Sequence, residues 1–156
     1  MTTPQEKPPY LGFGLGLRPQ HYPEILEGTD YEDKAKRVAG RTRELSQFLV
    51  HDRGATGFDA VCDGCTITVH RSCHGLRNLG VRGEVDELVR SIAGAEVVPL
   101  EGAEECCGFG GLFSVEMPDV SAAIMRQKLD NVEDSGANIL VGGDISCLLH
   151  LEGGLR

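Results

Sequence analysis

Two adjacent cysteines followed by a glycine, Cys106-Cys107-Gly108, are the residues of this sequence best suited to chemistry. The glycine permits a tight backbone turn, so both thiols can reach one small volume. Cys73 lies upstream of this pair, and Asp144-Ile145-Ser146-Cys147 lies downstream of it. Four thiols and one carboxylate can therefore converge. Thiolates at such a density select zinc, copper(I) or an iron–sulfur cluster, whereas calcium and magnesium prefer oxygen ligands.

The elements that must position these cysteines alternate between strands and helices. β-Branched or buried apolar runs predict strands at 66–70, 96–100 and 138–143, and a cysteine position follows each strand. Such alternation predicts a parallel sheet, whose ligands gather beyond the carboxyl ends of the strands. We therefore predict an α/β fold, with a small parallel sheet flanked by helices and all three cysteine positions at one edge.

Apolar residues at three- and four-residue steps mark the helices between these strands. The predicted helices cover about 31–52, the stretch from Val85 to Ile92, about 119–134, and a last turn that includes 148–151.

Length and composition exclude several classes of protein. A chain of 156 residues with 40% hydrophobic and 25% charged residues is typical of one globular domain. It has no apolar run long enough to cross a bilayer, and its first residues lack the layout of a secretory signal. We therefore expect a cytoplasmic protein, in which six cysteines are better explained as ligands or redox thiols than as disulfides. The formal charge of −9 argues against a nucleic-acid partner.

Residues 1–29 differ from the rest and predict an irregular arm before a domain over 30–156. This arm holds five of the seven prolines and the glycine-rich run Gly12–Arg18, which lacks the preceding strand and third glycine of a nucleotide loop. Within residues 10–28, this run and His21-Tyr22 resemble the start of the domain-of-unknown-function 692 family of multinuclear iron oxidases. That family needs a barrel of about 250 residues, so we expect His21 to be a surface residue.

Three interpretations of the cysteines follow from the residues themselves. They can be small apolar core residues. They can bind structural zinc, an interpretation that Cys62-x-x-Cys65 favours because it has the spacing of a zinc knuckle. They can hold an iron–sulfur centre, which best fits the adjacent pair Cys106-Cys107 because neighbouring thiolates can bind different irons. Backbone N–H groups of Gly108–Gly111 are then available to hydrogen-bond to cluster sulfurs.

Three motifs together, Ser72–Arg77, Glu105–Gly111 and Gly143–Leu148, resemble the cysteine-rich CCG domain of iron–sulfur oxidoreductases. This domain is found in heterodisulfide reductase and in the iron–sulfur subunits of glycolate and glycerol-3-phosphate dehydrogenases. The likeness covers about residues 31–156 and looks strongest to the C-terminal half of the lactate-utilisation A proteins.

This resemblance implies a ligand set and a function. It implies that the ligands of an iron–sulfur cluster, or of zinc as the alternative, are Cys73, Cys106, Cys107 and Cys147. Three further residues are expected around the ligands, namely Asp144, His74 and Gly108, with Asp144 favoured as a helix cap or outer residue over a ligand. The implied function is electron transfer in a lactate- or 2-hydroxyacid-oxidising complex. Its implied partners are other subunits or a second CCG domain.

The sequence also departs from the family pattern. Arg71 stands where an aspartate is usual before Ser-Cys, which predicts a cation beside Cys73. Cys62 and Cys65 have no counterpart in the pattern. The family proteins carry two CCG domains, and here the first is replaced by the oxidase-like start. The alternative function is therefore a zinc-stabilised interaction module or an inactive truncated CCG domain.

Overall fold

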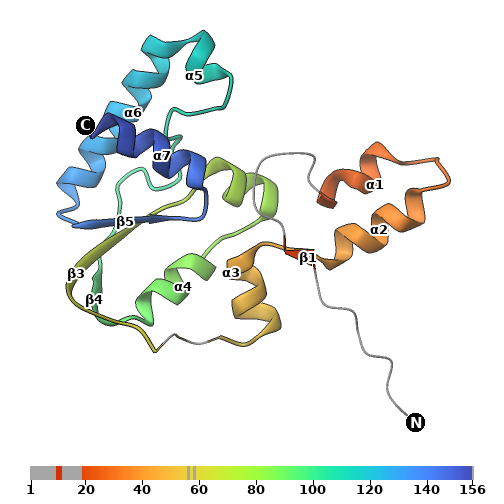
Figure 1. Ribbon diagram of the computed structural model, residues 1–156, viewed down its shortest axis with the longest axis horizontal. Helices are drawn as coiled ribbons and strands as arrows, with labels where there is room; N and C mark the ends of the chain where they lie inside the picture. The colour runs from red at the N-terminus through yellow and green to blue at the C-terminus, as the bar shows by residue number, and fades with distance from the viewer. Residues whose placement is uncertain (1–9, 12–18, 56, 58, 156) are drawn as a thin grey trace.

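A three-stranded parallel sheet forms the centre of the fold. The structure is a computed structural model that describes residues 10–11, 19–55, 57 and 59–155. The strands are β3 (Val61–His70), β4 (Ala93–Val97) and β5 (Ile139–Gly142), in the order β4-β3-β5 (Figure 1). All pairings are parallel, and Ile67 lies opposite both Val97 and Ile139. The predicted α/β fold with a small parallel sheet is confirmed.

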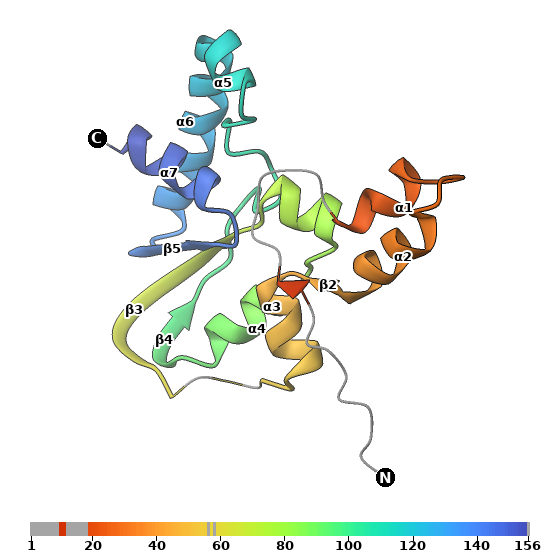
Figure 2. The ribbon, with the colours of Figure 1, turned by 45° about the vertical axis from the view of Figure 1, so that its right-hand side comes forward.

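Helices cover both faces of the sheet. Helix α4 (Glu84–Arg90) lies on one face, and helices α6 (Pro118–Asp134) and α7 (Ile145–Gly154) lie on the other (Figures 1 and 2). Side chains alternate between the faces of a strand. Thus Ile67 and Val69 pack with Val89 of α4 in one buried cluster, whereas His70 points to the α7 side.

A second buried cluster lies on the α6–α7 side and contains two of the cysteines. Cys107, Cys147 and Leu151 form its centre, with Phe109, Met125, Leu129 and Leu140 packed around them. The short helix α5 (Phe113–Glu116) leads from the cysteine loop into α6. Within the described part of the chain, no helix combines the length and apolar character needed to cross a membrane.

The N-terminal elements lie to one side of the sheet (Figure 2). Helical turns η1 (Pro19–His21) and α1 (Tyr22–Ile25) precede α2 (Glu32–Arg41), and β1 (Tyr10–Leu11) pairs in parallel with β2 (Thr42–Arg43). Residues 1–9 and 12–18 of the predicted arm over 1–29 lie outside the described residues. The described part of the oxidase-like stretch is helical from Pro19 to Ile25, and the His21 side chain is 41% exposed, as expected of a surface residue.

The single helix predicted over about 31–52 is wrong. The chain leaves α2 at Thr42, runs extended through β2, and re-enters helix as α3 (Leu45–Gln47) and the π-helical turn η2 (Phe48–Asp52). Glu44 caps α3, because its carboxylate accepts from the backbone of Ser46 at 2.7 Å and Gln47 at 3.3 Å. The capping residue starts a new helix, so the helix is broken here even though the apolar spacing of the sequence continues.

The remaining predicted elements exist with shifted bounds. The strand predicted at 66–70 begins at Val61, the strand predicted at 96–100 is β4, and the last helical turn extends to the ten residues of α7. A bulge between Val61 and Cys65 interrupts the regular alternation that marks a strand in sequence. This explains why the first half of β3 gave no strand signal.

Candidate metal centre

Four free cysteines from three segments meet at the carboxyl edge of the sheet. Cys73 directly precedes the π-helical segment η3 (His74–Leu79), Cys106 and Cys107 lie on the loop after β4, and Cys147 lies in the first turn of α7. Cys107 and Cys147 are buried, and the other two are half-buried. Their side chains form two neighbouring pairs, Cys73 with Cys106 and Cys107 with Cys147.

A backbone hydrogen bond holds the loop after β4 against the end of β3. The N–H of Arg71 donates to the carbonyl of Ala103 at 3.0 Å, three residues before the adjacent cysteines. The loop therefore returns to the strand end that carries Cys73. This contact brings together residues that are far apart in the sequence.

Gly108 lets the cysteine loop lie flat against α6. Its φ of +94° is strained for other residues, and a Cβ atom would lie 2.5 Å from the carbonyl oxygen of Ser121. The Ser121 hydroxyl donates to the Gly108 carbonyl at 2.9 Å, and the Gly108 N–H donates to the sulfur of Cys106 at 3.3 Å. The glycine thus packs the loop and places one N–H donor on a thiol sulfur.

The buried pair Cys107–Cys147 shares one proton. A hydrogen bond from the Cys147 thiol lowers the pKa of Cys107 to about 4, and His70 adds to this effect. The same hydrogen bond, together with burial, raises the pKa of Cys147. At the outer pair, burial raises the pKa of Cys106. The directions of these shifts make Cys107 the thiol of the pair that ionises more readily, and Cys147 the one that holds its proton more tightly.

His70 belongs to this group, although the sequence analysis did not select it. Its side chain is 2% exposed, and neither ring nitrogen makes a hydrogen bond of good geometry among the described residues, although His70 lies close enough to Cys107 to lower the pKa of that thiol. A ligand atom of His70 and the sulfurs of Cys107 and Cys147 all lie within 4.8 Å of one another. Buried imidazole nitrogens normally have partners. A His at a strand end, close before a Ser-Cys motif, was the signal available in the sequence.

Lys128 is a second residue that the sequence analysis missed. This α6 side chain is only 1% exposed, and its ammonium group donates to the carbonyl of Gly102. Burial lowers the pKa of Lys128, whereas Glu105 and the thiols of Cys107, Cys106 and Cys73 raise it, in decreasing order. A buried cation faces the cysteine group and offsets its negative charge.

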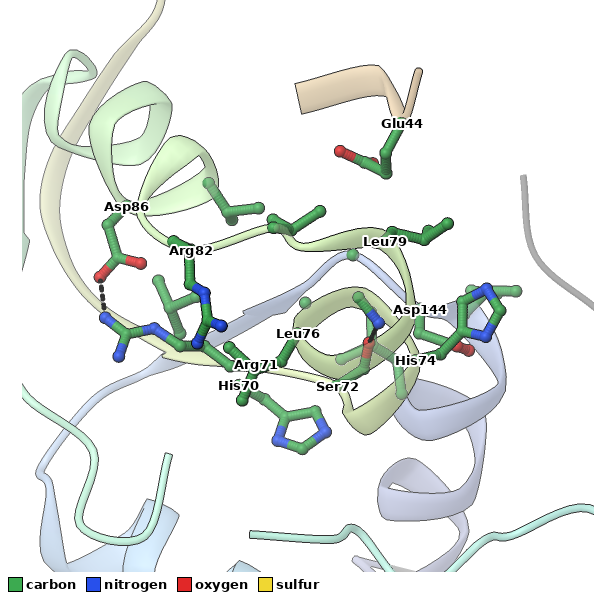
Figure 3. Close-up of a pocket in the computed structure, with 18 residues that line it drawn as sticks. Glu44, His70, Arg71, Ser72, His74, Leu76, Leu79, Arg82, Asp86 and Asp144 are labelled. Atoms are coloured by element: carbon green, nitrogen blue, oxygen red, sulfur yellow. Dashed lines mark hydrogen bonds and ion pairs between the residues drawn. The ribbon is translucent and has the colours of Figure 1, made fainter. Parts of the chain in front are cut away.

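The expected outer residues take different places. Asp144 caps α7, because its carboxylate accepts from the N–H of Ser146 at 2.9 Å. His74 and Asp144 both line a pocket of about 500 Å³ on the α4 side of the strand ends (Figure 3). No cysteine is among the described residues that line this pocket. The cap interpretation of Asp144 agrees with the structure.

Arg71, expected as a cation beside Cys73, is held in ion pairs with two carboxylates. Its guanidinium group lies in ion pairs with Asp86 at 3.2 Å and Glu104 at 3.4 Å (Figure 3 shows the first). Arg71 directly follows His70, the last residue of β3, and its side chain is turned toward Asp86 of α4 while His70 lies beside Cys107 and Cys147. Lys128, from the other face, provides the nearby positive charge instead.

Cys62 and Cys65 form a disulfide, with their Cα atoms 5.5 Å apart. They lie in the first half of β3, whereas the four free cysteines gather beyond its far end. The preference for ligands is therefore wrong for this pair, whereas the alternative of redox thiols remains compatible with a disulfide. The zinc-knuckle interpretation of Cys62-x-x-Cys65 loses its support in the same way, because both sulfurs are bonded to each other.

Comparison with known proteins gives a consistent family match. The family CCG, described as "Cysteine-rich domain", matches residues 67–152. "Lactate utilization protein A" of Macrococcus caseolyticus (strain JCSC5402) is 41% identical over 138 residues, covering 88% of this chain and 56% of that protein. The protein of the same name from Bacillus subtilis (strain 168) is 38% identical over 137 residues, covering 87% and 57%. The chain thus spans a little over half the length of these curated relatives.

Proposed function

This chain belongs to the CCG cysteine-rich domain family, and on that premise we propose that it is an iron–sulfur electron-transfer subunit, or part of one, in lactate utilisation. The names of the relatives support the metabolic role. The proposed domain covers residues 30–156, and the proposed ligands are Cys73, Cys106, Cys107 and Cys147. Other subunits of a lactate-oxidising complex, or a second CCG domain, are the proposed partners.

One observation carries this proposal: four free thiols from three segments meet in two neighbouring pairs at one sheet edge. Thiolates are the ligands that iron–sulfur clusters take. The buried and otherwise unpartnered imidazole of His70 lies beside them, and the buried ammonium group of Lys128 faces them. The donor set fits a cluster, since it offers soft ligands, a positive counter-charge and an N–H donor from Gly108 to a sulfur.

Individual residues have different roles in the proposed binding of the metal. Cys107 is the first ligand available, because its pKa is lowered and its thiol loses a proton more readily than that of Cys147. Cys147 must lose its proton on binding, and its raised pKa makes metal uptake release that proton. The positive charge of Lys128 offsets the negative charge of the bound thiolates. A bound cluster would supply one-electron storage between an oxidation and an acceptor.

Zinc is the alternative that a specific observation favours. His70, Cys107 and Cys147 form a three-donor group of the composition found in zinc sites. A protein with zinc there would be a stabilised interaction module without a redox role. A truncated CCG domain that binds no metal is the remaining alternative.

Metal analysis of the anaerobically purified protein separates these functions. Iron and acid-labile sulfide in matched amounts, with visible absorbance that bleaches on reduction, are the expected result. Cys106→Ser is expected to lose most of both. The matched control is Cys62→Ser/Cys65→Ser, which removes two cysteines outside the centre and should keep both. Zinc alone, or no metal in any variant, would contradict electron transfer.

A further inference from the structure

The Cys62–Cys65 disulfide has no place in the metal centre and needs its own explanation. We propose that it is a thiol–disulfide exchange site, reduced by the dithiol of a thioredoxin-type protein. This activity is separate from metal binding. It depends on a cysteine pair that the CCG pattern does not contain.

The pair is separated from the metal centre along the central strand. Five residues of extended chain at about 3.3 Å each place Cys65 roughly 16 Å from His70. Cys62 lies farther away still. Neither sulfur is therefore able to join the ligands beyond the strand ends.

The disulfide closes a bulge in β3. Val61 lies opposite Ala93 and Cys65 opposite Ala95, so that four steps of β3 match two steps of β4. The Asp63 side chain fills the space over Gly94, where a Cβ would collide with it. On the other side, the Asn138 amide donates to the carbonyl of Gly64 at 3.2 Å. These contacts hold the bulge on both sides independently of the S–S bond.

This bulge presents the sulfurs to a protein partner. Both cysteines are half-exposed, and the two residues between them are exposed. A disulfide between residues three positions apart closes a very short loop, which gives little of the entropic stabilisation expected of a structural disulfide. The Cys-x-x-Cys spacing, by contrast, is the one used for exchange with thiols.

The surroundings of the two sulfurs differ, and this selects the point of attack. Cys65 packs against the buried cluster of Ile67, Val69 and Val89. Cys62 is not among the described residues that pack against this cluster. An incoming thiolate therefore reaches Cys62 first, and Cys65 is the leaving sulfur.

The exchange balances with one dithiol. The partner thiolate forms an S–S bond to Cys62 and breaks the Cys62–Cys65 bond, and the Cys65 sulfur leaves with the electron pair and takes up a proton. The second partner thiol then attacks the mixed disulfide, releases Cys62 as a thiolate that is protonated, and leaves the partner oxidised. Two electrons and two protons pass from the partner to this chain.

A trapping experiment tests the site. The purified protein is incubated with thioredoxin whose second active-site cysteine is replaced by serine, and the mixed disulfide is mapped by peptide mass spectrometry. We expect a 1:1 adduct at Cys62, and none in the Cys62→Ser/Cys65→Ser variant, which retains the four other cysteines. In an equilibrium titration with unmodified thioredoxin, we expect half of the Cys62–Cys65 disulfide to be reduced at a ratio of reduced to oxidised thioredoxin between about 1:100 and 100:1.

Three results would overturn the proposal. The first is an adduct only at the four cysteines of the metal centre. The second is a disulfide that thioredoxin reduces only after the protein has been unfolded, which would make it a structural link. The third is stoichiometric zinc lost in the double variant, which would make the pair a metal site. An adduct at Cys65 instead would overturn the assignment of Cys62 as the attacked sulfur.

Discussion

Replacing Gly108 by alanine tests whether the cysteine loop must lie against α6. The change adds one methyl group at a φ of +94°, with its carbon 2.5 Å from the Ser121 carbonyl oxygen and 3.1 Å from the Met125 nitrogen. Both contacts are to helix backbone, which cannot move aside as a flexible side chain would. The loop, the helix or both must shift.

The expected loss of stability in Gly108→Ala has two parts. A positive φ costs an alanine about 1–2 kcal/mol, and overpacking adds about 1–3 kcal/mol. Gly111 provides the matched control, because its φ of +63° is also positive while a Cβ there meets nothing within 4 Å. Gly111→Ala should therefore show only the first part, and Gly108→Ala should be less stable than Gly111→Ala by the second part, about 1–3 kcal/mol.

Thermal and denaturant unfolding of the two variants measures this difference. For a domain of this size, each kcal/mol corresponds to a Tm change of roughly 2–4 °C. Gly108→Ala should also lose bound metal, since the shift moves the loop that carries Cys106 and Cys107. Equal losses of stability in the two variants would show that the close contact between Gly108 and α6 does not affect the stability of the protein.

Three further predictions concern the buried groups around the thiols. His70→Leu should raise the pKa of Cys107 in the metal-free protein, because His70 helps to lower it, and should weaken metal retention about tenfold in chelator competition; an unchanged titration of the thiol would contradict this role of His70. Lys128→Met should weaken metal binding about tenfold in the same assay because the counter-charge is lost, and unchanged affinity would contradict that role. In the metal-free protein, the lowered pKa of Cys107 adds stability that is complete above the ordinary thiol value of 9.0 and is lost as the pH falls toward about 4. Denaturation between about pH 5 and 8 should therefore show stability rising with pH, and Cys147→Ala should flatten that rise.

The sequence predicted the sheet edge well because its signals are local. A β-branched or apolar run marks each strand within a few residues, and parallel pairing then follows from the alternation with helices. Cys73 and Cys147 follow their strands closely in the chain, so their placement needed no further information. The cap by Asp144 is equally local, since it spans only the first turn of α7.

Predictions failed where burial depends on distant segments. Lys128 ends the polar run Arg126-Gln127-Lys128 on α6 and looks like a solvated residue, yet the loop at Gly102 covers it. Arg71 was expected as a cation beside Cys73, but its guanidinium group forms an ion pair with Asp86 of α4, a residue fifteen positions farther along the chain. The break at Thr42 was missed because the apolar spacing of 31–52 continues across the cap at Glu44.

The sequence by itself determined the chemistry that is available, namely soft thiols at the ends of parallel strands and a glycine beside two of them. Only the tertiary structure decided how these thiols are paired, which thiol is ionised, and that His70 and Lys128 surround them. It also separated Cys62 and Cys65 from the other four. The physical reason is that residue type and periodicity are properties of short stretches, whereas burial, pKa and contact between sulfurs arise from segments that meet only on folding.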